Sequence, residues 1–225
     1  MSLVALISYS APAGQAIGGV PGRTAGFAHL VSFCARVSNP NNQFNSETSQ
    51  KLIRYLIKNK HWSPLEMVNV CLEIRGTRDI LRQILRHRSF SFQEFSQRYA
   101  DPVKELEFET REARLQDPKN RQNSIEFDED SELHAAWEAK QRMIIHEVEM
   151  AYKWAIDNGI AKEQARVVLP EGLTMSRMYM NGSLRSWIHY IELRQGNGTQ
   201  KEHMEIAKQC AIEIARIFPL IWEIQ

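Results

Sequence analysis

The chain has 225 residues, of which 43% are hydrophobic and 24% are charged, and its formal net charge is +1. This composition is typical of a folded globular protein and excludes an intrinsically disordered chain. The small net charge argues against generic binding to nucleic acid, because that binding depends on a large excess of Lys and Arg facing phosphates.

The first part of the chain predicts two strands and three helices. An apolar run over 4–8 predicts a strand, and a Gly-rich loop follows it through Gly26. Helices are predicted over 29–37 and from about residue 45 to the residues before Ser63-Pro64. Residues 67–74 alternate and are rich in Val, Leu and Ile, which predicts a strand with one buried face. Thr77 or Asp79 then caps a helix that runs to about Arg88.

The second part of the chain contains a charged stretch and further helices. Residues 101–130 hold many charges and few apolar positions, which predicts a mobile surface insertion, the charged segment. A long amphipathic helix over 132–158 is expected to stop at Asn158-Gly159, and a short helix over 162–167 follows. A strand over 173–180 is expected to turn at Asn181-Gly182 into a helix over 184–194.

The last helix completes the predicted fold. It is expected to begin at Thr199, because Thr199 and Glu202 have the spacing of a capping box, and to end near Phe218. Helix exceeds strand in this pattern, and the length suits one domain. We therefore expect a single α/β domain over 1–225, of the α+β type, in which a central, mostly antiparallel sheet is flanked by long helices.

Cysteine spacing and hydropathy limit the metal sites, disulfides and cellular location that we expect. Cys34, Cys71 and Cys210 lie far apart without CxxC spacing, so neither a zinc site nor a disulfide framework is indicated. No stretch reaches the roughly 18 consecutive apolar residues of a membrane helix, and the apolar first nine residues have neither the basic region nor the length expected of a signal peptide. The expectation is a cytoplasmic protein with no membrane partner and no metal.

Polar and charged side chains concentrate at the end of the third predicted helix. Its apolar stripe is Ile80, Leu81, Ile84 and Leu85, and its opposite face is Arg82, Gln83, Arg86 and His87. Arg88 points back toward the stripe, where its guanidinium would need an anion. The alternative is that these basic residues only offset the helix dipole. Hydroxyl, amide, carboxylate and guanidinium groups crowd residues 89–98, which favours a site for a phosphate and a polar ring.

The same stretch carries a resemblance to a known family. RHRSFSFQEFSQRY, residues 86–99, resembles the RHRxxSxNExSxRY signature of flavin-dependent thymidylate synthases, with Gln93 in the place of Asn. HWSPLEM at 61–67 is similar to the HxTPxEH element of the family, with Ser63 and Met67 in the places of Thr and His. Further similar strings are CARVS at 34–38, ARVVLP at 165–170, NGSLRSWIHYIELR at 181–194 and GNGTQKEH at 196–203.

The resemblance implies residues for two ligands. In the family, dUMP lies between a helix of one subunit and the signature loop of another. The residues expected to bind dUMP are Gln83, Arg86, Glu94, Phe95, Ser96, Gln97, Arg98, Arg166 and Arg194. The residues expected to bind FAD are Ser63, Arg86, His87, Arg88, Glu94, Ser183, Arg185 and His189. Arg194 is the expected catalytic residue, because the matching arginine favours ionisation of the pyrimidine at N3 and makes C5 more nucleophilic.

The resemblance also implies a reaction and an assembly. The expected reaction converts dUMP, 5,10-methylenetetrahydrofolate and NADPH into dTMP, tetrahydrofolate and NADP, with bound FAD as the relay, in a homotetramer with shared active sites. Cys71 and Cys210 are expected in the core and Cys34 has only Arg36 nearby, so no cysteine is assigned as a nucleophile. Two alternatives stay open: a flavin-dependent pyrimidine nucleotide hydroxymethylase, and a nucleic-acid-binding module that uses Arg86, Arg88 and Arg98 on phosphates.

Overall fold

A four-stranded antiparallel sheet forms the centre of the protein. The computed structural model describes residues 3–13, 26–128, 130–196 and 198–223. The strands lie in the order β1-β2-β6-β3, and their bounds are β1 Val4–Tyr9, β2 Asn69–Thr77, β3 Ser91–Glu94 and β6 Met175–Ser183. The two central strands pair along their whole length, from Asn69↔Ser183 to Thr77↔Met175. The predicted α+β class with an antiparallel sheet is confirmed.

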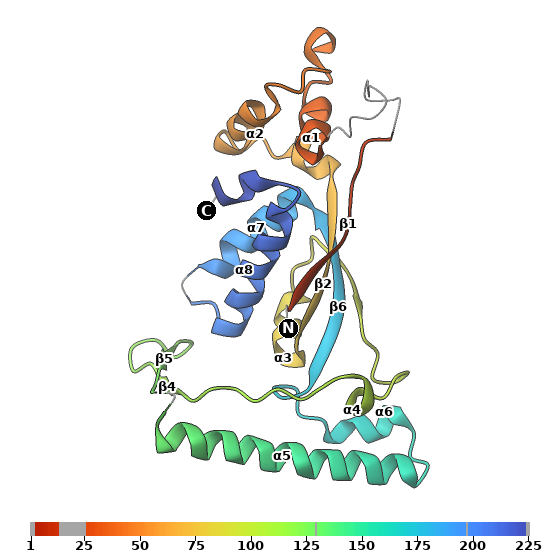
Figure 1. Ribbon diagram of the computed structural model, residues 1–225, viewed down its shortest axis with the longest axis vertical. Coiled ribbons are helices and arrows are strands. Elements are labelled where there is room, and N and C mark those ends of the chain that lie inside the picture. The colour runs from red at the N-terminus through yellow and green to blue at the C-terminus, as the bar shows by residue number, and fades with distance from the viewer. Residues whose placement is uncertain (1–2, 14–25, 129, 197, 224–225) are drawn as a thin grey trace.

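Helices cover one face of this sheet and extend beyond both of its ends (Figure 1). The helices near the sheet are α3 Arg78–Ile84, α7 Leu184–Gln195 and α8 Lys201–Ala215. The outlying helices are α1 Phe27–Ala35, α2 Ser49–Lys58, α4 Pro102–Glu105, α5 Glu132–Asp157 and α6 Lys162–Ala165, and short 3-10 turns are η2 Pro40–Asn42, η3 Ser63–Met67, η4 Arg166–Val168 and η5 Pro219–Glu223. Figure 1 shows α1 and α2 at one end of the molecule and α5 lying across the other.

The core lies between one face of the sheet and the helices α3, α7 and α8. Alternation along β2 buries Val70, Leu72 and Ile74 completely, as the sequence predicted for a strand with one buried face. Trp187 of α7 is also fully buried, and its indole N–H donates to the carbonyl oxygen of Val70 at 2.9 Å. Figure 1 shows α7 and α8 together beside the sheet. This packing fixes the start of α7 against the start of β2.

Three predictions for residues 85–94 are wrong: the end of α3, the direction of Arg88 and the absence of a strand. Helix α3 ends at Ile84 rather than near Arg88, because the amides of Arg86 and His87 bond back to the carbonyls of Gln83 and Ile84 and tighten the chain into a turn. Arg88 is exposed rather than directed toward the apolar stripe. The stretch 91–94, predicted only as part of a loop, pairs with β6 as strand β3.

Asn181-Gly182 is not a turn, because both residues belong to β6 and pair with Cys71 and Val70 of β2. The glycine is required by side-chain packing, because a Cβ at Gly182 would lie 2.4 Å from the Phe90 ring. The prediction of a turn there is therefore wrong, although the predicted helix that follows is confirmed as α7. Phe90 lies against the sheet where Gly182 leaves room for its ring.

The predicted capping box at the last helix is also wrong. Helix α8 begins at Lys201 with Gln200 as its N-cap, and no side chain caps it. Glu202 instead forms an ion pair with Arg114 of the charged segment. An ion-pair partner from elsewhere in the chain has replaced the local backbone contact that the spacing predicted.

The charged segment has more structure than the sequence predicted. It contains α4 and a hairpin of β4 Arg114–Gln116 and β5 Ser124–Glu126. Arg111 pairs with Asp79 at 2.7 Å, and its backbone exchanges two hydrogen bonds of 2.8 Å with the side chain of Gln141 on α5. The segment thus links α3 to α5.

Helix α5 is confirmed with almost the bounds that periodicity predicted. In the part of the chain that the structure describes, no helix, including the 26-residue α5, is apolar enough along its length to cross a membrane.

Candidate active site

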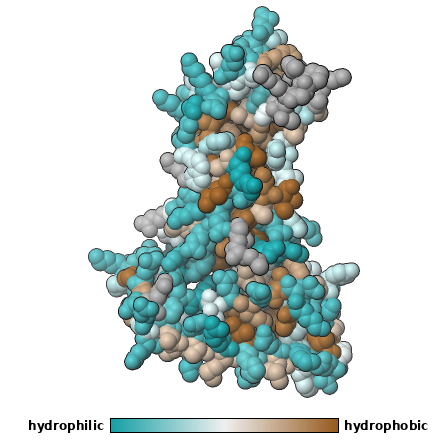
Figure 2. Space-filling model, viewed as in Figure 1, coloured by the Kyte–Doolittle hydropathy of each residue, from teal (hydrophilic) through white to brown (hydrophobic). Residues whose placement is uncertain are grey.

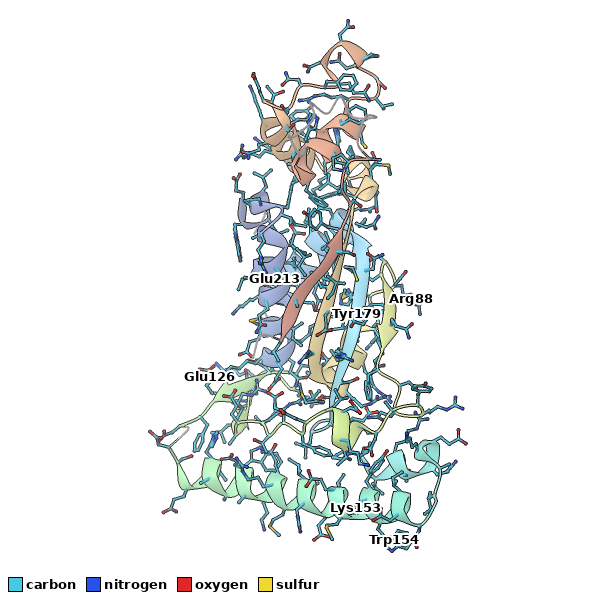
Figure 3. The ribbon with its side chains drawn as sticks, turned by 45° about the vertical axis from the view of Figure 1, so that its right-hand side comes forward. Arg88, Glu126, Lys153, Trp154, Tyr179 and Glu213 are labelled. Carbon is cyan, nitrogen blue, oxygen red and sulfur yellow. The ribbon has the colours of Figure 1, made fainter. Side chains whose placement is uncertain are left out.

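The turn between α3 and β3 is held by one aromatic anchor. The Phe90 ring packs on Trp187 with ring centroids 4.8 Å apart and on Tyr190 at 6.0 Å. Because this anchor is buried, the preceding residues of the turn are fixed at the surface of the core. Arg86 and Arg88 are exposed there and His87 is half-buried. Figure 3 shows Arg88 projecting outward from the side of the sheet.

Arg194, in the last turn of α7, meets His87. The Arg194 Nε–H donates to His87 Nε2 at 2.9 Å, so the imidazole accepts and is neutral. Burial, aided by the charge of Arg194, lowers the pKa of His87 to about 4. Among the described residues, no carboxylate lies within the 4.0 Å of an ion pair with Arg194. The site therefore contains a half-buried cation without a counter-ion, which favours an anionic ligand.

Behind this pair lies a buried polar cluster, which we define as Gln83, Tyr190, Gln200 and His203. His203 is fully buried; its Nδ1 is 3.2 Å from Gln83 Oε1 and its Nε2 is 3.2 Å from the Tyr190 hydroxyl. The Gln83 amide in turn donates to Gln200 Oε1 at 2.9 Å. The Tyr190 ring also packs edge-on against His87 at 4.9 Å. The buried polar cluster therefore packs against His87, the partner of Arg194.

The second half of the signature lies at another surface. Glu94 accepts a hydrogen bond from Ser176 at 3.1 Å, and the Phe95 amide bonds to the carbonyl of Arg177, so this part leaves the sheet in a fixed direction. Ser96 is exposed and Gln97 is buried. The signature stretch therefore begins beside Arg194 and ends at the outlying helices.

Arg98 and Arg166 meet around Glu163 on α6. The Arg98 guanidinium is 3.1 Å from the Glu163 carboxylate, and the Arg166 Nε–H donates to the Glu163 carbonyl at 3.3 Å. We call Arg98 and Arg166 with Glu163 the outer arginine pair. Within the described residues, no hydrogen bond or ion pair joins the outer arginine pair to Arg194, His87 or the buried polar cluster. The residues predicted for dUMP therefore form two separate groups in one chain.

The residues predicted for FAD at the start of α7 lie together. Ser183 is the N-cap of α7, and Arg185 on the first turn pairs with Glu66 at 2.7 Å. A hydrogen bond from Ser183, with a smaller contribution from Arg185, holds the pKa of Glu66 below its usual value. His189 packs edge-on against Trp62 at 4.6 Å. Ser63 follows Trp62 at the beginning of η3 and is exposed.

Sequence reasoning missed Tyr190, Gln200 and His203. The signal for His203 was present, because it falls on the apolar stripe of α8 that continues through Ile206 and Cys210. A polar side chain on such a stripe needs a buried partner. Glu66 was missed as well, although it lies in the quoted element 61–67. The described residues contain no group of three or more His, Cys, Asp or Glu side chains placed to hold a metal ion.

Within the described residues, a guanidinium that lies against a neutral imidazole and has no carboxylate partner favours an anionic ligand that accepts hydrogen bonds. The chain belongs to the thymidylate synthase complementing protein family, whose model matches residues 22–220. That range includes the charged segment.

Individual relatives agree with the family match. The chain is 47% identical to the flavin-dependent thymidylate synthase of Synechocystis sp., over 85% of this chain and 86% of the relative. It is 46% identical to the probable flavin-dependent thymidylate synthase of Paramecium bursaria Chlorella virus 1, over 85% of this chain and 87% of the relative. Among solved structures, a UMP/dUMP methylase, PolB, from Streptomyces cacaoi bound with 5-Br dUMP has a TM-score of 0.76 and 25% identity, and the match covers 98% of this chain and 93% of that one.

Proposed function

We propose that the chain catalyses the reductive methylation of dUMP to dTMP, with 5,10-methylenetetrahydrofolate as carbon donor and NADPH as reductant through bound FAD. The observation that carries the proposal is Arg194, a cation beside a neutral imidazole and without a carboxylate partner among the described residues. Membership of the family and the relatives named above support the same reaction.

Arg194 is the proposed catalytic residue. Because the pKa of His87 is lowered to about 4, the imidazole adds no second charge at neutral pH, and it holds the guanidinium through Nε only. The two terminal nitrogens of Arg194 are left to face the pyrimidine. A fixed cation there stabilises negative charge that develops on the ring and favours attack from C5, without reorganisation during the reaction.

The remaining residues proposed to bind dUMP belong to the group around Arg194 or to the outer arginine pair and its loop. Gln83 and Arg86 are proposed to bind the nucleotide beside Arg194. Arg98 and Arg166 of the outer arginine pair are proposed to bind the phosphate, because Arg presents a planar fork to phosphate oxygens. The rest of the loop, Glu94, Phe95, Ser96 and Gln97, is proposed to enclose the sugar and phosphate through its backbone amides.

The donors near the start of α7 fit FAD. Arg86 and Arg88 are exposed, and neither forms an ion pair in the parts of the chain that the structure describes, so both are available for pyrophosphate oxygens. The residues proposed to hold FAD are Ser63, Arg86, His87, Arg88, Glu94, Ser183, Arg185 and His189. When bound, FAD supplies the hydride transfer that reduction of the transferred carbon requires.

Two observations support a homotetramer with shared active sites as part of the proposal. The outer arginine pair and Arg194 lie in separate groups of one chain, and in an assembly the outer arginine pair of one copy and Arg194 of another would meet at one ligand. Large apolar side chains of α5 are exposed by 46–63%: Leu133, Trp137, Met143, Ile144, Met150 and Trp154. Figure 2 shows hydrophobic side chains among hydrophilic ones at that end, and Figure 3 shows Trp154 directed away from the body. Such surface is typical of an interface.

The same end of the molecule brings the apolar surface next to the proposed phosphate site. Val167, the neighbour of Arg166, is 84% exposed. A second copy that covers this surface would therefore also reach Arg166. A cytoplasmic location completes the proposal and is supported by the free cysteines Cys34, Cys71 and Cys210.

The test is the spectrum and the product of the purified chain. We expect flavin absorbance that bleaches with NADPH and dUMP, and a nucleotide product that carries a methyl group. A product heavier by one oxygen would identify a hydroxymethylase instead. A colourless protein that binds oligonucleotides with a steep dependence on salt would contradict the proposal.

A further inference from the structure

The hydrogen bonds of the buried polar cluster have a defined direction. Gln83 donates from Nε2 to Gln200, so its carbonyl Oε1 faces His203. A carbonyl oxygen only accepts, and the hydrogen of the imidazole is therefore on Nδ1. Nε2 of the neutral ring then accepts, and the Tyr190 hydroxyl donates to it. Burial, with the charge of Arg194, lowers the pKa of His203 to about 3, so the ring is neutral.

This arrangement connects His203 to Gln83 and Arg194, two of the residues proposed to bind dUMP. Its Nδ1–H fixes the carbonyl of Gln83, and one amide hydrogen of Gln83 is used on Gln200, which leaves the other for a ligand. Its Nε2 fixes the hydroxyl of Tyr190, whose ring packs on His87, the acceptor of the Arg194 hydrogen bond. One buried side chain thus holds two ligand groups that come from α3 and α7.

Stability alone does not account for a histidine at this position. His203 continues the apolar stripe of α8, where Ile206, Ala207 and Cys210 are all at most 2% exposed. Replacing a buried polar group and its partners by apolar groups of similar size is often neutral or stabilising. A fully satisfied buried network instead specifies one arrangement of its members.

We propose that His203 is a positioning residue, which through Gln83 directly and through Tyr190 and His87 indirectly fixes the amide and the guanidinium that bind the pyrimidine of dUMP. The inference rests on the proposed function, because dUMP is the ligand in both. His203 itself contacts neither substrate nor cofactor in this account.

A double-mutant cycle in the holoenzyme tests this inference. His203→Leu is expected to raise the dissociation constant of dUMP by about 10-fold, the effect of losing one hydrogen bond that orients a ligand group. In a Gln83→Ala background the same substitution is expected to change dUMP affinity by less than about 2-fold, because residues that act through one another are not additive. FAD content and the melting temperature report folding in every variant.

Two further variants separate positioning from packing. His203→Gln keeps an N–H for Gln83 and is expected to regain most of the affinity that His203→Leu loses. Tyr190→Phe removes only the hydroxyl that donates to His203 and serves if His203→Leu does not fold; it is expected to weaken dUMP binding while FAD content stays the same.

The outcomes separate this inference from the proposed function. Equal losses from His203→Leu with and without Gln83 would overturn it, as would unchanged dUMP affinity in His203→Leu or, where that variant does not fold, in Tyr190→Phe. If the unaltered protein binds no dUMP at all, the proposed function itself is wrong, and this result differs from a loss seen only in the variants.

Discussion

The two groups of proposed dUMP residues are built in different ways. Gln83 and Arg194 are held by a buried network whose His203 is fully buried, so their arrangement is preformed within one chain. In the outer arginine pair, the side chains of Arg98 and Glu163 are 65% and 49% exposed. An exposed ion pair contributes only about 0–1 kcal/mol and exchanges partners easily. The half that contains Gln83 and Arg194, the inner half, is therefore rigid in the single chain. The outer arginine pair, the outer half, is free to be completed by ligand and a second copy.

Removing the guanidinium of the rigid half should have the largest effect. Arg194→Ala is expected to lower kcat by about 10²–10³-fold, because one preorganised charge-stabilising group is lost, while FAD stays bound. Steady-state dTMP formation and flavin absorbance measure the two effects. Arg216→Ala is the matched control, since Arg216 follows α8, is 67% exposed and, among the described residues, forms an ion pair with Glu213 alone. Normal turnover in Arg194→Ala would remove the basis for the catalytic assignment.

The rigidity of the inner half can be broken through its anchor. In Gly182→Ala the new Cβ would lie 2.4 Å from the Phe90 ring, which must then move and shift the turn that carries Arg86 and His87. We expect a loss of about 1–3 kcal/mol of stability and reduced activity. Thermal melting measures the first. Gly172→Ala is the control, because a Cβ there meets nothing within 4 Å. Equal melting temperatures for the two variants would show that Phe90 is not the anchor.

The burial of the inner half predicts a dependence of stability on pH. The pKa of His203 is lowered to about 3, so between about pH 6.5 and pH 3 the unfolded chain binds a proton that the folded chain does not. Stability from this group is therefore present above about pH 6.5 and is lost as the pH falls, by at most about 1.4 kcal/mol per pH unit. His29 and His87, whose pKa values are also lowered, act in the same direction.

The His203→Gln variant isolates the contribution of His203. Denaturation of both proteins between pH 5 and pH 7 should show a shallower loss of stability for the variant. Parallel curves would mean that His203 is already accessible to protons in the folded protein.

The smallest effect is expected at the outer arginine pair. Glu163→Gln breaks its exposed ion pair with Arg98 and should change the free energy of unfolding by less than about 1 kcal/mol. Chemical denaturation measures the change. A loss as large as that of Gly182→Ala would show that this half is as tightly built as the inner one.

Local periodicity in the sequence was enough to predict most elements of the fold. Strand β2 and helices α5 and α7 have regular apolar spacing, and all three occur where the spacing placed them. Strand β3 was missed because its four residues show little periodicity and it exists by pairing with β6. Asn181-Gly182 was misread because the glycine makes room for Phe90, a contact 92 positions from Gly182 in the sequence, rather than for a turn.

Sequence motifs indicated part of the candidate site, but the contacts that depend on packing between distant segments could not be predicted. The signature over 86–99 indicated the arginines, and the structure places Arg194 against His87 within that signature. Tyr190 and His203 come together only because α7 packs on α8, and no local spacing predicts that pairing. The roles of the individual residues stay predictions until ligands are bound.

Mixing two inactive proteins tests the shared site most directly. Arg194→Ala damages only the inner half and Arg98→Ala only the outer half, so each protein alone should make little dTMP. If each site combines the inner half of one copy with the outer half of another, co-expressed mixtures contain sites with both halves intact, and dTMP formation should return. A mixture no more active than its two parents would contradict the account, because both halves would then belong to one chain.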